Sequence, residues 1–198
     1  MEIDTLTLGL YQTNCYIVTA VPGQCVVIDP GYEPETIDSF LLRRGLRPEA
    51  ILLTHGHFDH VGGVMALVKK YGCPVYLSPE DLKLPPYLTL PVGATQDVAE
   101  GMTLFLAGTA FQVLAVPGHT DGSVCYRAEN ALFCGDTLFR GACGRTDLPG
   151  GNAAKMLASM KRLRELDFDG AFYPGHGPAG TLEQERRENP YLTGELFV

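Results

Sequence analysis

The chain has 198 residues, of which 45% are hydrophobic and 19% charged, and its formal net charge is −8. This length suits one domain with a substantial core, so we expect residues 1–198 to fold as a single domain. The acidic balance and the lack of a Lys/Arg run disfavour nucleic acid as a partner. No apolar run reaches the ~18 residues of a membrane-spanning helix, which disfavours a membrane protein. The acidic start Met1–Asp4 does not resemble a signal peptide, so we expect a cytoplasmic protein.

The first half of the chain alternates between strand-like and helix-like patterns. β-branched content and turn signals predict strands over Ile3–Leu8, Cys15–Thr19, Gln24–Asp29 and Ala50–Thr54, with a helix over Glu35–Arg44 before the last of them. After the segment His55–His60, a helical pattern follows over Val61–Tyr71 and a strand over Pro74–Ser78. The histidine segment therefore lies on a loop from a strand end to a helix start, which is where α/β folds place ligands.

The second half is rich in predicted antiparallel strands. Pro79–Gly101 is poorly periodic, and we expect irregular surface structure there. Strands are predicted over Thr103–Leu106, Phe111–Val116, Ser123–Arg127, Ala131–Cys134 and Ala171–Tyr173. A Gly-rich loop, Gly141–Asn152, precedes a helix with an apolar face of Met156, Leu157, Met160, Leu163 and Leu166, and the Thr181–Gln184 capping box begins a last helix.

The six cysteines form no CxxC pair and show no zinc-finger spacing. Most of them lie in apolar strand-like stretches, so we expect small, reduced core residues rather than disulfides. Cys143, in the Gly-rich loop, is the exception whose role stays open.

The chain places all five of its histidines in three short glycine-containing loops. They are His55, His57 and His60 in the first loop, His119 in the second and His176 in the third. Two aspartates share this placement: Asp59 lies inside the first loop, and Asp136 follows the strand Ala131–Cys134. A single HxH pair would be weak evidence for a metal, but the whole set at successive strand ends is far more specific.

Imidazole and carboxylate ligands together suit zinc, with iron and manganese as the other candidates. Seven ligands exceed what one tetrahedral ion accepts, whereas two ions ~3.5–4 Å apart, sharing one carboxylate and a hydroxide, would use all seven. We expect Asp136 to be the bridge, and we assign Asp59 and Asp136 to the catalytic machinery. A metal-bound hydroxide would be the nucleophile, so the predicted reaction is hydrolysis, and the positive centre would favour an anionic small substrate.

At these residues the sequence resembles the metallo-β-lactamase superfamily. The resemblance is carried by Ile28–Gly31, Thr54–His60, Val116–Ser123, Gly135–Phe139 and Pro174–Pro178. It implies an α/β (α+β) fold, the four-layer αββα sandwich of that superfamily. It also implies one metal on His55, His57 and His119, a second on Asp59, His60 and His176, and a bridging Asp136.

Several positions resemble one subgroup more than the others. Asp136 disfavours the true β-lactamases and His57 disfavours the flavodiiron proteins, while the chain has no room for the inserted domain of RNA-processing members. Gly135–Phe139 together with Gly144–Gly151 is similar to the small, single-domain glyoxalase II-like hydrolases. This resemblance implies hydrolysis of a small anionic thioester such as S-lactoylglutathione.

The sequence departs from the two-domain glyoxalase II pattern after its last histidine. Only 22 residues follow His176, where those enzymes carry a helical region that helps to hold glutathione. Asp121 stands where the family usually has proline, and we expect a turn residue there, with a role near the metals as the alternative.

Three further residues are candidates for supporting roles. Arg140 and Arg145 flank the Gly-rich loop, and either could bind a substrate carboxylate. The alternative is that each is a solvent-exposed charge or forms an ion pair with a nearby acid such as Asp147. Asp29 could orient a metal-ligating histidine, or could simply form the turn before Pro30.

Three other functions stay open. A persulfide dioxygenase of the same fold would use one iron on His55, His119 and Asp136, and it shares the Gly144–Asp147 stretch. A phosphodiesterase of the same fold is the second alternative. A metal-binding module without turnover is the third, although a degenerate member would usually have lost a ligand.

Overall fold

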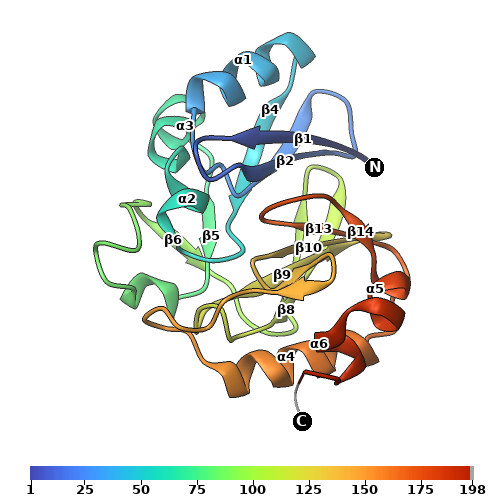
Figure 1. Cartoon of the computed structure of the whole chain (residues 1–198). Helices are drawn as coiled ribbons and strands as arrows, with labels where there is room; N and C mark the ends of the chain where they lie inside the picture. The colour runs from blue at the N-terminus through green and yellow to red at the C-terminus, as the bar shows by residue number, and fades with distance from the viewer. Residues whose placement is uncertain (197–198) are drawn as a thin grey trace.

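Two β-sheets stacked face to face form the middle of the molecule, and helices cover the outer face of each (Figure 1). The structure is a computed structural model, and it describes residues 1–196. The four layers therefore follow the order helix, sheet, sheet, helix, which confirms the αββα sandwich predicted from the sequence.

The first sheet contains six strands in chain order. They are β1 (Glu2–Leu8), β2 (Thr13–Thr19), β3 (Gln24–Ile28), β4 (Arg47–Leu52), β5 (Val75–Leu77) and β6 (Thr95–Asp97). The pairs β1/β2 and β2/β3 are antiparallel, whereas β3/β4, β4/β5 and β5/β6 are parallel. The parallel pairs require crossover connections, and the helices of this half supply the first two of them.

The second sheet has the order β14-β13-β10-β9-β8-β7. Its strands are β7 (Thr103–Leu106), β8 (Thr109–Ala115), β9 (Val124–Ala128), β10 (Ala131–Gly135), β13 (Ala171–Pro174) and β14 (Gly180–Thr181). Strands β7 to β10 form an antiparallel meander, as predicted, and β13 pairs parallel with β10. A small hairpin of β11 (Leu138–Phe139) and β12 (Ala142–Cys143) lies between β10 and the next helix.

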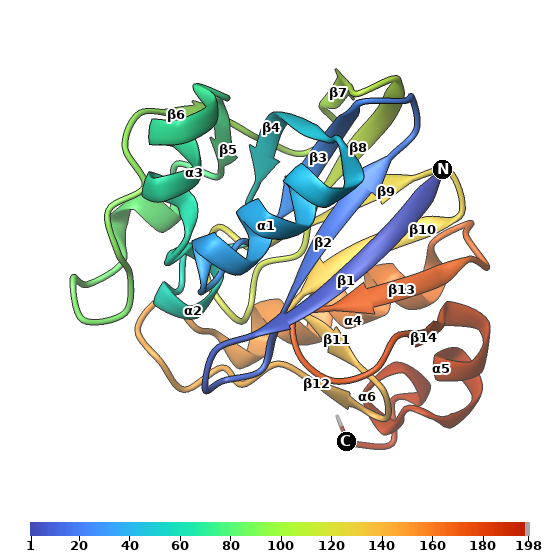
Figure 2. The same ribbon diagram turned by 90° about the horizontal axis from the view of Figure 1, so that it is seen from above.

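Helices α1 (Pro34–Arg44) and α3 (Val64–Tyr71) lie on the outer face of the first sheet, as the view from above shows (Figure 2). Helices α4 (Ala153–Glu165), α5 (Leu182–Glu188) and α6 (Pro190–Thr193) lie on the outer side of the second sheet (Figure 1). The predicted cap of α5 is present, since the Thr181 hydroxyl accepts a hydrogen bond from the Gln184 backbone N–H. In the part of the chain that the structure describes, no helix combines the length and the apolar character that crossing a bilayer requires.

Alternating side chains divide the core into three apolar layers. On β3, Val26 and Ile28 face the second sheet, while Cys25 and Val27 face α1 and α3. On β9, Tyr126 lies between the sheets and Cys125 faces α4. Both sheets thus bury both faces, because successive residues of a strand point to opposite sides.

The cysteines behave as the sequence predicts. All six are free; five are buried in the core, and Cys143 is half-buried on β12. Burial raises the pKa of the Cys143 thiol to about 11, which makes this cysteine a poor nucleophile at neutral pH.

Two sequence-based expectations need correction near the site. The single helix over Val61–Tyr71 is interrupted, and α2 (Phe58–Val61) and α3 are separate. The Gly63 backbone N–H donates to the Pro30 carbonyl at 2.7 Å instead of continuing the first helix. A Cβ at Gly62 would lie 2.2 Å from the Gly31 carbonyl oxygen, so the break depends on a close backbone approach that periodicity does not reveal.

The segment Pro79–Gly101 is not simply irregular surface. It contains a short 3₁₀ helix (Asp81–Lys83) and strand β6, and it buries Asp81, Leu88 and Val98.

The apolar face predicted for α4 is narrower than expected. Leu157 is 39% exposed and so lies outside the buried face formed by Met156, Met160 and Leu163.

Candidate metal centre

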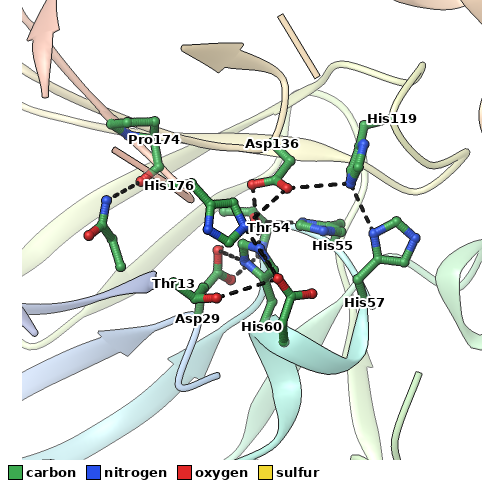
Figure 3. Close-up of polar contacts among 12 residues, drawn as sticks. Thr13, Asp29, Thr54, His55, His57, His60, His119, Asp136, Pro174 and His176 are labelled. Carbon is green, nitrogen blue, oxygen red and sulfur yellow. Dashed lines mark hydrogen bonds and ion pairs between the residues drawn. The ribbon is translucent and has the colours of Figure 1, made fainter. Parts of the chain in front are cut away.

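The predicted ligands meet at one edge of the two sheets. His55 to His60 follow β4, His119 follows β8, Asp136 follows β10 and His176 follows β13. The first four side chains thus follow a strand of the first sheet, and the last three follow strands of the second. The close-up shows the five histidines and Asp136 converging on one point (Figure 3). Seven residues spread over 122 positions are gathered here because each follows the carboxyl end of a strand.

The first half of the cluster consists of His55, His57 and His119. One nitrogen from each of the three rings lies within 4.8 Å of the others. His57 Nδ1 lies 2.9 Å from His119 Nε2, and all three rings are buried. This trio provides three imidazole ligands around one point, as a tetrahedral zinc site with an open fourth position requires.

The second half consists of Asp59, His60 and His176. His176 Nε2 lies 3.2 Å from Asp59 Oδ2, and His60 Nε2 lies 3.8 Å from the same oxygen. The potential ligand atoms of these residues also lie within 4.8 Å of one another.

Asp136 lies between the two halves. Its Oδ1 is 3.4 Å from His60 Nε2, and its Oδ2 is 3.4 Å from His176 Nε2 and 3.6 Å from His119 Nε2. One carboxylate therefore faces ligands of both groups, which is the placement predicted for the bridge (Figure 3). A Cβ at Gly175 would lie 2.1 Å from Asp136 Oδ1, so only glycine lets the His176 loop approach this closely.

The residues present fit a metal centre. His55 Nε2, His60 Nε2 and Asp136 Oδ1 are buried and have no hydrogen-bond partner among residues 1–196, although unpaired buried polar atoms are costly. The opposite ring nitrogens are held: His55 Nδ1 by the Thr54 hydroxyl, His119 Nδ1 by the Arg145 carbonyl, and His176 Nδ1 by the Tyr11 carbonyl. Such contacts leave the other nitrogen free for a cation, as in known metal sites.

Asp29 supports the second half of the cluster. Its carboxylate accepts hydrogen bonds from the Thr54 N–H at 2.8 Å, from the Thr54 hydroxyl at 2.6 Å and from His60 Nδ1 at 3.0 Å. Its φ of 50° lies in the left-handed region, which Asp tolerates better than most residues. Asp29 thus both forms the turn before Pro30 and orients His60, so its two candidate roles coincide.

The electrostatics differ between the halves in the metal-free chain. Burial, reinforced by the neighbouring His119 and His60, lowers the pKa of His57 to about 4, and burial lowers the pKa of His55 strongly. For His176, burial also acts to lower the pKa, but the carboxylates of Asp136 and Asp59 outweigh it and raise the pKa to about 10. His55 and His57 therefore present neutral imidazoles, and at His176 a bound cation would take the place of a proton.

The sequence did not reveal the role of Asp81. This carboxylate is 1% exposed and accepts hydrogen bonds from Gly56 N–H, Gly122 N–H and the Thr120 hydroxyl. Gly56 and Thr120 belong to the loops of His55 and His119. A lone Asp in a proline-rich, poorly periodic segment gives no signal of this role, because the role arises only from tertiary contacts.

The remaining candidate residues lie around the cluster. Arg145 forms a two-pronged ion pair with Asp147, with donor–acceptor distances of 2.7 and 2.8 Å, and it lines the cavity over the cluster. Arg140 is exposed and is not among the described residues lining that cavity. Asp121 forms an exposed ion pair with Lys155, as suits a turn residue.

A cavity of about 350 Å³ opens directly over the cluster. Its floor contains ligand residues from both halves, including His57, Asp136 and His176. Its walls are mainly apolar and consist of Tyr11, Phe58, Leu88 and Leu148 together with Arg145. The cluster is thus accessible to a small molecule.

A buried His/Asp cluster at the shared edge of two sheets defines a metal-binding protein of the αββα class. A family model described as the metallo-β-lactamase superfamily matches residues 8–176. The chain belongs to this superfamily.

Similar proteins have been found in sequence and in structure. Uncharacterized proteins of Mycobacterium tuberculosis and Mycobacterium bovis are 37% identical over 221 residues, covering 98% of this chain and 99% of theirs. The solved BLEG-1 B3 metallo-β-lactamase is 36% identical, with a TM-score of 0.90 over 98% of this chain and 100% of its own.

Two further structures carry informative descriptions. TTHA1623, solved in a di-iron-bound form, is 44% identical, with a TM-score of 0.87 over 96% of this chain and 100% of its own. ETHE1 from Myxococcus xanthus is 30% identical, with a TM-score of 0.82 over 98% of this chain and 85% of its own.

Proposed function

We propose that the protein is a dinuclear metal-dependent hydrolase of small thioesters, of the glyoxalase II-like type. The observation that carries this proposal is the position of Asp136, whose two oxygens face ligands of both metal groups. One carboxylate shared by two ions is the arrangement expected of a two-metal hydrolase. The Gly135–Phe139 and Gly144–Gly151 stretches supply the resemblance to thioester hydrolases.

Two bound divalent ions would lower the pKa of a water molecule to about 7 and polarise the thioester carbonyl. The chain holds the ligands in place: His55, His57 and His119 on one side, and Asp59, His60 and His176 on the other. The apolar walls limit the access of bulk water, which strengthens electrostatic interactions inside the cavity.

The cavity supports a small substrate with one apolar part. Tyr11 packs edge-on against Phe58, with ring centroids 5.3 Å apart, so the two rings form a fixed wall beside the cluster. Arg145 is the cation of this cavity, and a substrate carboxylate would have to compete with Asp147 for it. We therefore place the substrate carbonyl over the cluster and its acyl group against the aromatic wall.

Zinc is the metal we propose, because imidazole-rich sites with a carboxylate suit it. Iron is the main alternative, and the di-iron form of TTHA1623 favours it by similarity. Metal identity is decided by elemental analysis of protein purified without chelator.

The proposed activity is tested by adding S-lactoylglutathione to protein loaded with zinc or, separately, with iron. Loss of thioester absorbance, abolished by chelator and restored by metal, is the expected result. The proposed activity would be contradicted if the protein binds a single iron, consumes oxygen with glutathione persulfide and cleaves no thioester. That result would favour the persulfide dioxygenase.

β-Lactam hydrolysis is a second candidate because of the similarity to BLEG-1, which is described as a B3 metallo-β-lactamase. Asp136 remains the argument against it, since true β-lactamases lack a bridging aspartate. Cleavage of a chromogenic cephalosporin at a rate above that of the thioester would reverse the order of the two candidates.

A further inference from the structure

One buried carboxylate outside the ligand set contacts both loops of the first metal group. Asp81 lies on the 3₁₀ helix that follows β5, and its side chain is 1% exposed. In the described residues, it belongs to none of the three-residue groups that could hold a metal. Its burial therefore needs another explanation, because an ionised carboxylate leaves water only when it is well hydrogen-bonded.

Each oxygen of Asp81 is used. Oδ2 accepts the Gly56 N–H at 2.7 Å and the Thr120 hydroxyl at 2.9 Å, while Oδ1 accepts the Gly122 N–H at 2.8 Å. Gly56 lies between His55 and His57, and Thr120 follows His119. A single side chain thus joins the two loops that carry all three ligands of the first group.

Both loops are shaped to admit this carboxylate. A Cβ at Gly122 would lie 2.4 Å from Asp81 Oδ1, and a Cβ at Gly56 would lie 3.1 Å from the Asp81 Cβ. A side chain at Gly122 would displace the carboxylate, and one at Gly56 would crowd it. Thr120 is held in turn, because its hydroxyl lies 2.8 Å from the Ser123 hydroxyl.

The second metal group has different supports. Asp29 holds His60, and the Tyr11 carbonyl holds His176. The Asp81 carboxylate contacts neither His60 nor His176 through any hydrogen bond or ion pair in the described part of the chain. Loss of Asp81 should therefore act on one half of the cluster.

We propose that Asp81 is a positioning residue that sets the spacing of the His55/His57 loop and the His119 loop, and thereby selectively sets the affinity of the first metal position. The inference rests on the metal centre of the proposed function, but not on the substrate.

The test is a titration of metal-free protein with Co²⁺, followed by calorimetry and by the visible spectrum. Asp81→Asn keeps the shape of the side chain but replaces one acceptor oxygen by a donor that faces an N–H or hydroxyl group. We expect one binding constant to fall about 10- to 100-fold, as found for other residues that orient metal ligands, and the other to change less than about threefold. The variants His57→Ala and His176→Ala identify which constant belongs to which position.

Glu80→Gln is the matched control. Glu80 is the neighbour of Asp81, but its side chain is 50% exposed and pairs with Lys83, so neither binding constant should change. If Asp81→Asn does not fold, Thr120→Val removes one of the three donors, and it should weaken the same position by about three- to tenfold.

Unchanged constants in Asp81→Asn, or an equal loss at both positions, would overturn the inference. The inference is also overturned if the wild-type protein binds a single ion and the affinity for that ion changes by less than about threefold in Asp81→Asn. A wild-type protein that binds two ions but cleaves no thioester would contradict the proposed function alone, because the titration needs no substrate.

Discussion

At the scale of single residues, the effect of a substitution on metal binding depends on whether the side chain contacts one metal group or both. Asp136 faces His60, His119 and His176 within 3.6 Å and so contacts residues of both predicted metal groups. Removing it should therefore affect both metal positions, unlike removal of any single histidine.

We predict that Asp136→Ala lowers the metal content at both positions and reduces hydrolysis by at least about 100-fold, because a bridging ligand is lost. Elemental analysis after dialysis gives the metal content. Asp121→Ala is the control, since Asp121 is exposed and paired with Lys155. Full stoichiometry with normal activity in Asp136→Ala would exclude the dinuclear assignment.

Asp29→Asn should weaken the second metal position about 10- to 100-fold, because His60 Nδ1 loses its carboxylate acceptor. The same change leaves buried donors of Thr54 poorly paired, so the metal-free protein should lose about 1–3 kcal/mol of unfolding free energy. Urea unfolding with chelator present measures this loss. An unchanged midpoint together with unchanged metal affinity would show that Asp29 is only a turn residue.

The sequence reveals the candidate metal ligands but not all of the residues that support them. The histidines could be predicted because every one of them lies in a glycine-containing loop after a strand, which is a local pattern. Asp81 could not, because its three partners come from loops 25 to 41 positions away. Asp29 was a candidate because it stands in a recognisable turn before Pro30.

At the scale of elements, the β1–β2 hairpin holds the loop of His176. The Asn14 side-chain amide donates to the Pro174 carbonyl at 3.1 Å and to the Gly177 carbonyl at 2.8 Å, and the Asn14 N–H donates to the Gly175 carbonyl at 2.7 Å. Strands of the first sheet thus fix a ligand carried by the second.

Asn14→Ala should leave the Gly177 carbonyl without this donor and remove one of the two donors to the Pro174 carbonyl, which keeps the Tyr16 hydroxyl. We expect a cost of about 1–3 kcal/mol of unfolding free energy. The substitution should also weaken the metal position that includes His176 more than the other. Thermal unfolding and the Co²⁺ titration measure the two effects. Leu10→Ala on the same hairpin is the control, because Leu10 is 98% exposed; an equal effect of both variants would rule out this role for Asn14.

Elements with a strong period could be predicted, and those shaped by tertiary contacts could not. Five strands of each sheet and helices α1 and α4 lie where alternation or helical spacing indicates them, whereas β6 and β14 (Gly180–Thr181) were not predicted. The break between α2 and α3 escaped prediction because it depends on the approach of Gly62 and Gly63 to the 30–31 backbone. Strand β6 escaped because its three residues, Thr95–Asp97, lie at a sheet edge with little apolar content.

At the scale of the whole molecule, the cluster lies where the two sheets meet at one edge, beside the apolar layer that packs between them. Ligands before residue 61 come from the first half of the sandwich, and ligands after residue 118 come from the second. A bound metal pair therefore links the halves and should stabilise the folded chain as a whole.

Removal of metal by chelator should lower the unfolding temperature, and added Zn²⁺ should restore it. Free metal at 100 times its dissociation constant contributes about 2.7 kcal/mol for one site, provided that it binds only the folded state. Differential scanning calorimetry measures the shift. An unfolding temperature that does not respond to chelator or Zn²⁺ would show that no tightly bound metal links the sheets.

Metal stoichiometry is the most direct test of the dinuclear centre. Protein expressed in zinc-supplemented medium and purified without chelator is analysed for its elements alongside Asp136→Ala. We predict about two metal ions per chain in the wild type and a clear loss at both positions in the variant. About one ion per chain in the wild type, unchanged in Asp136→Ala, would contradict the bridging role of Asp136 and the hydrolase proposed from it.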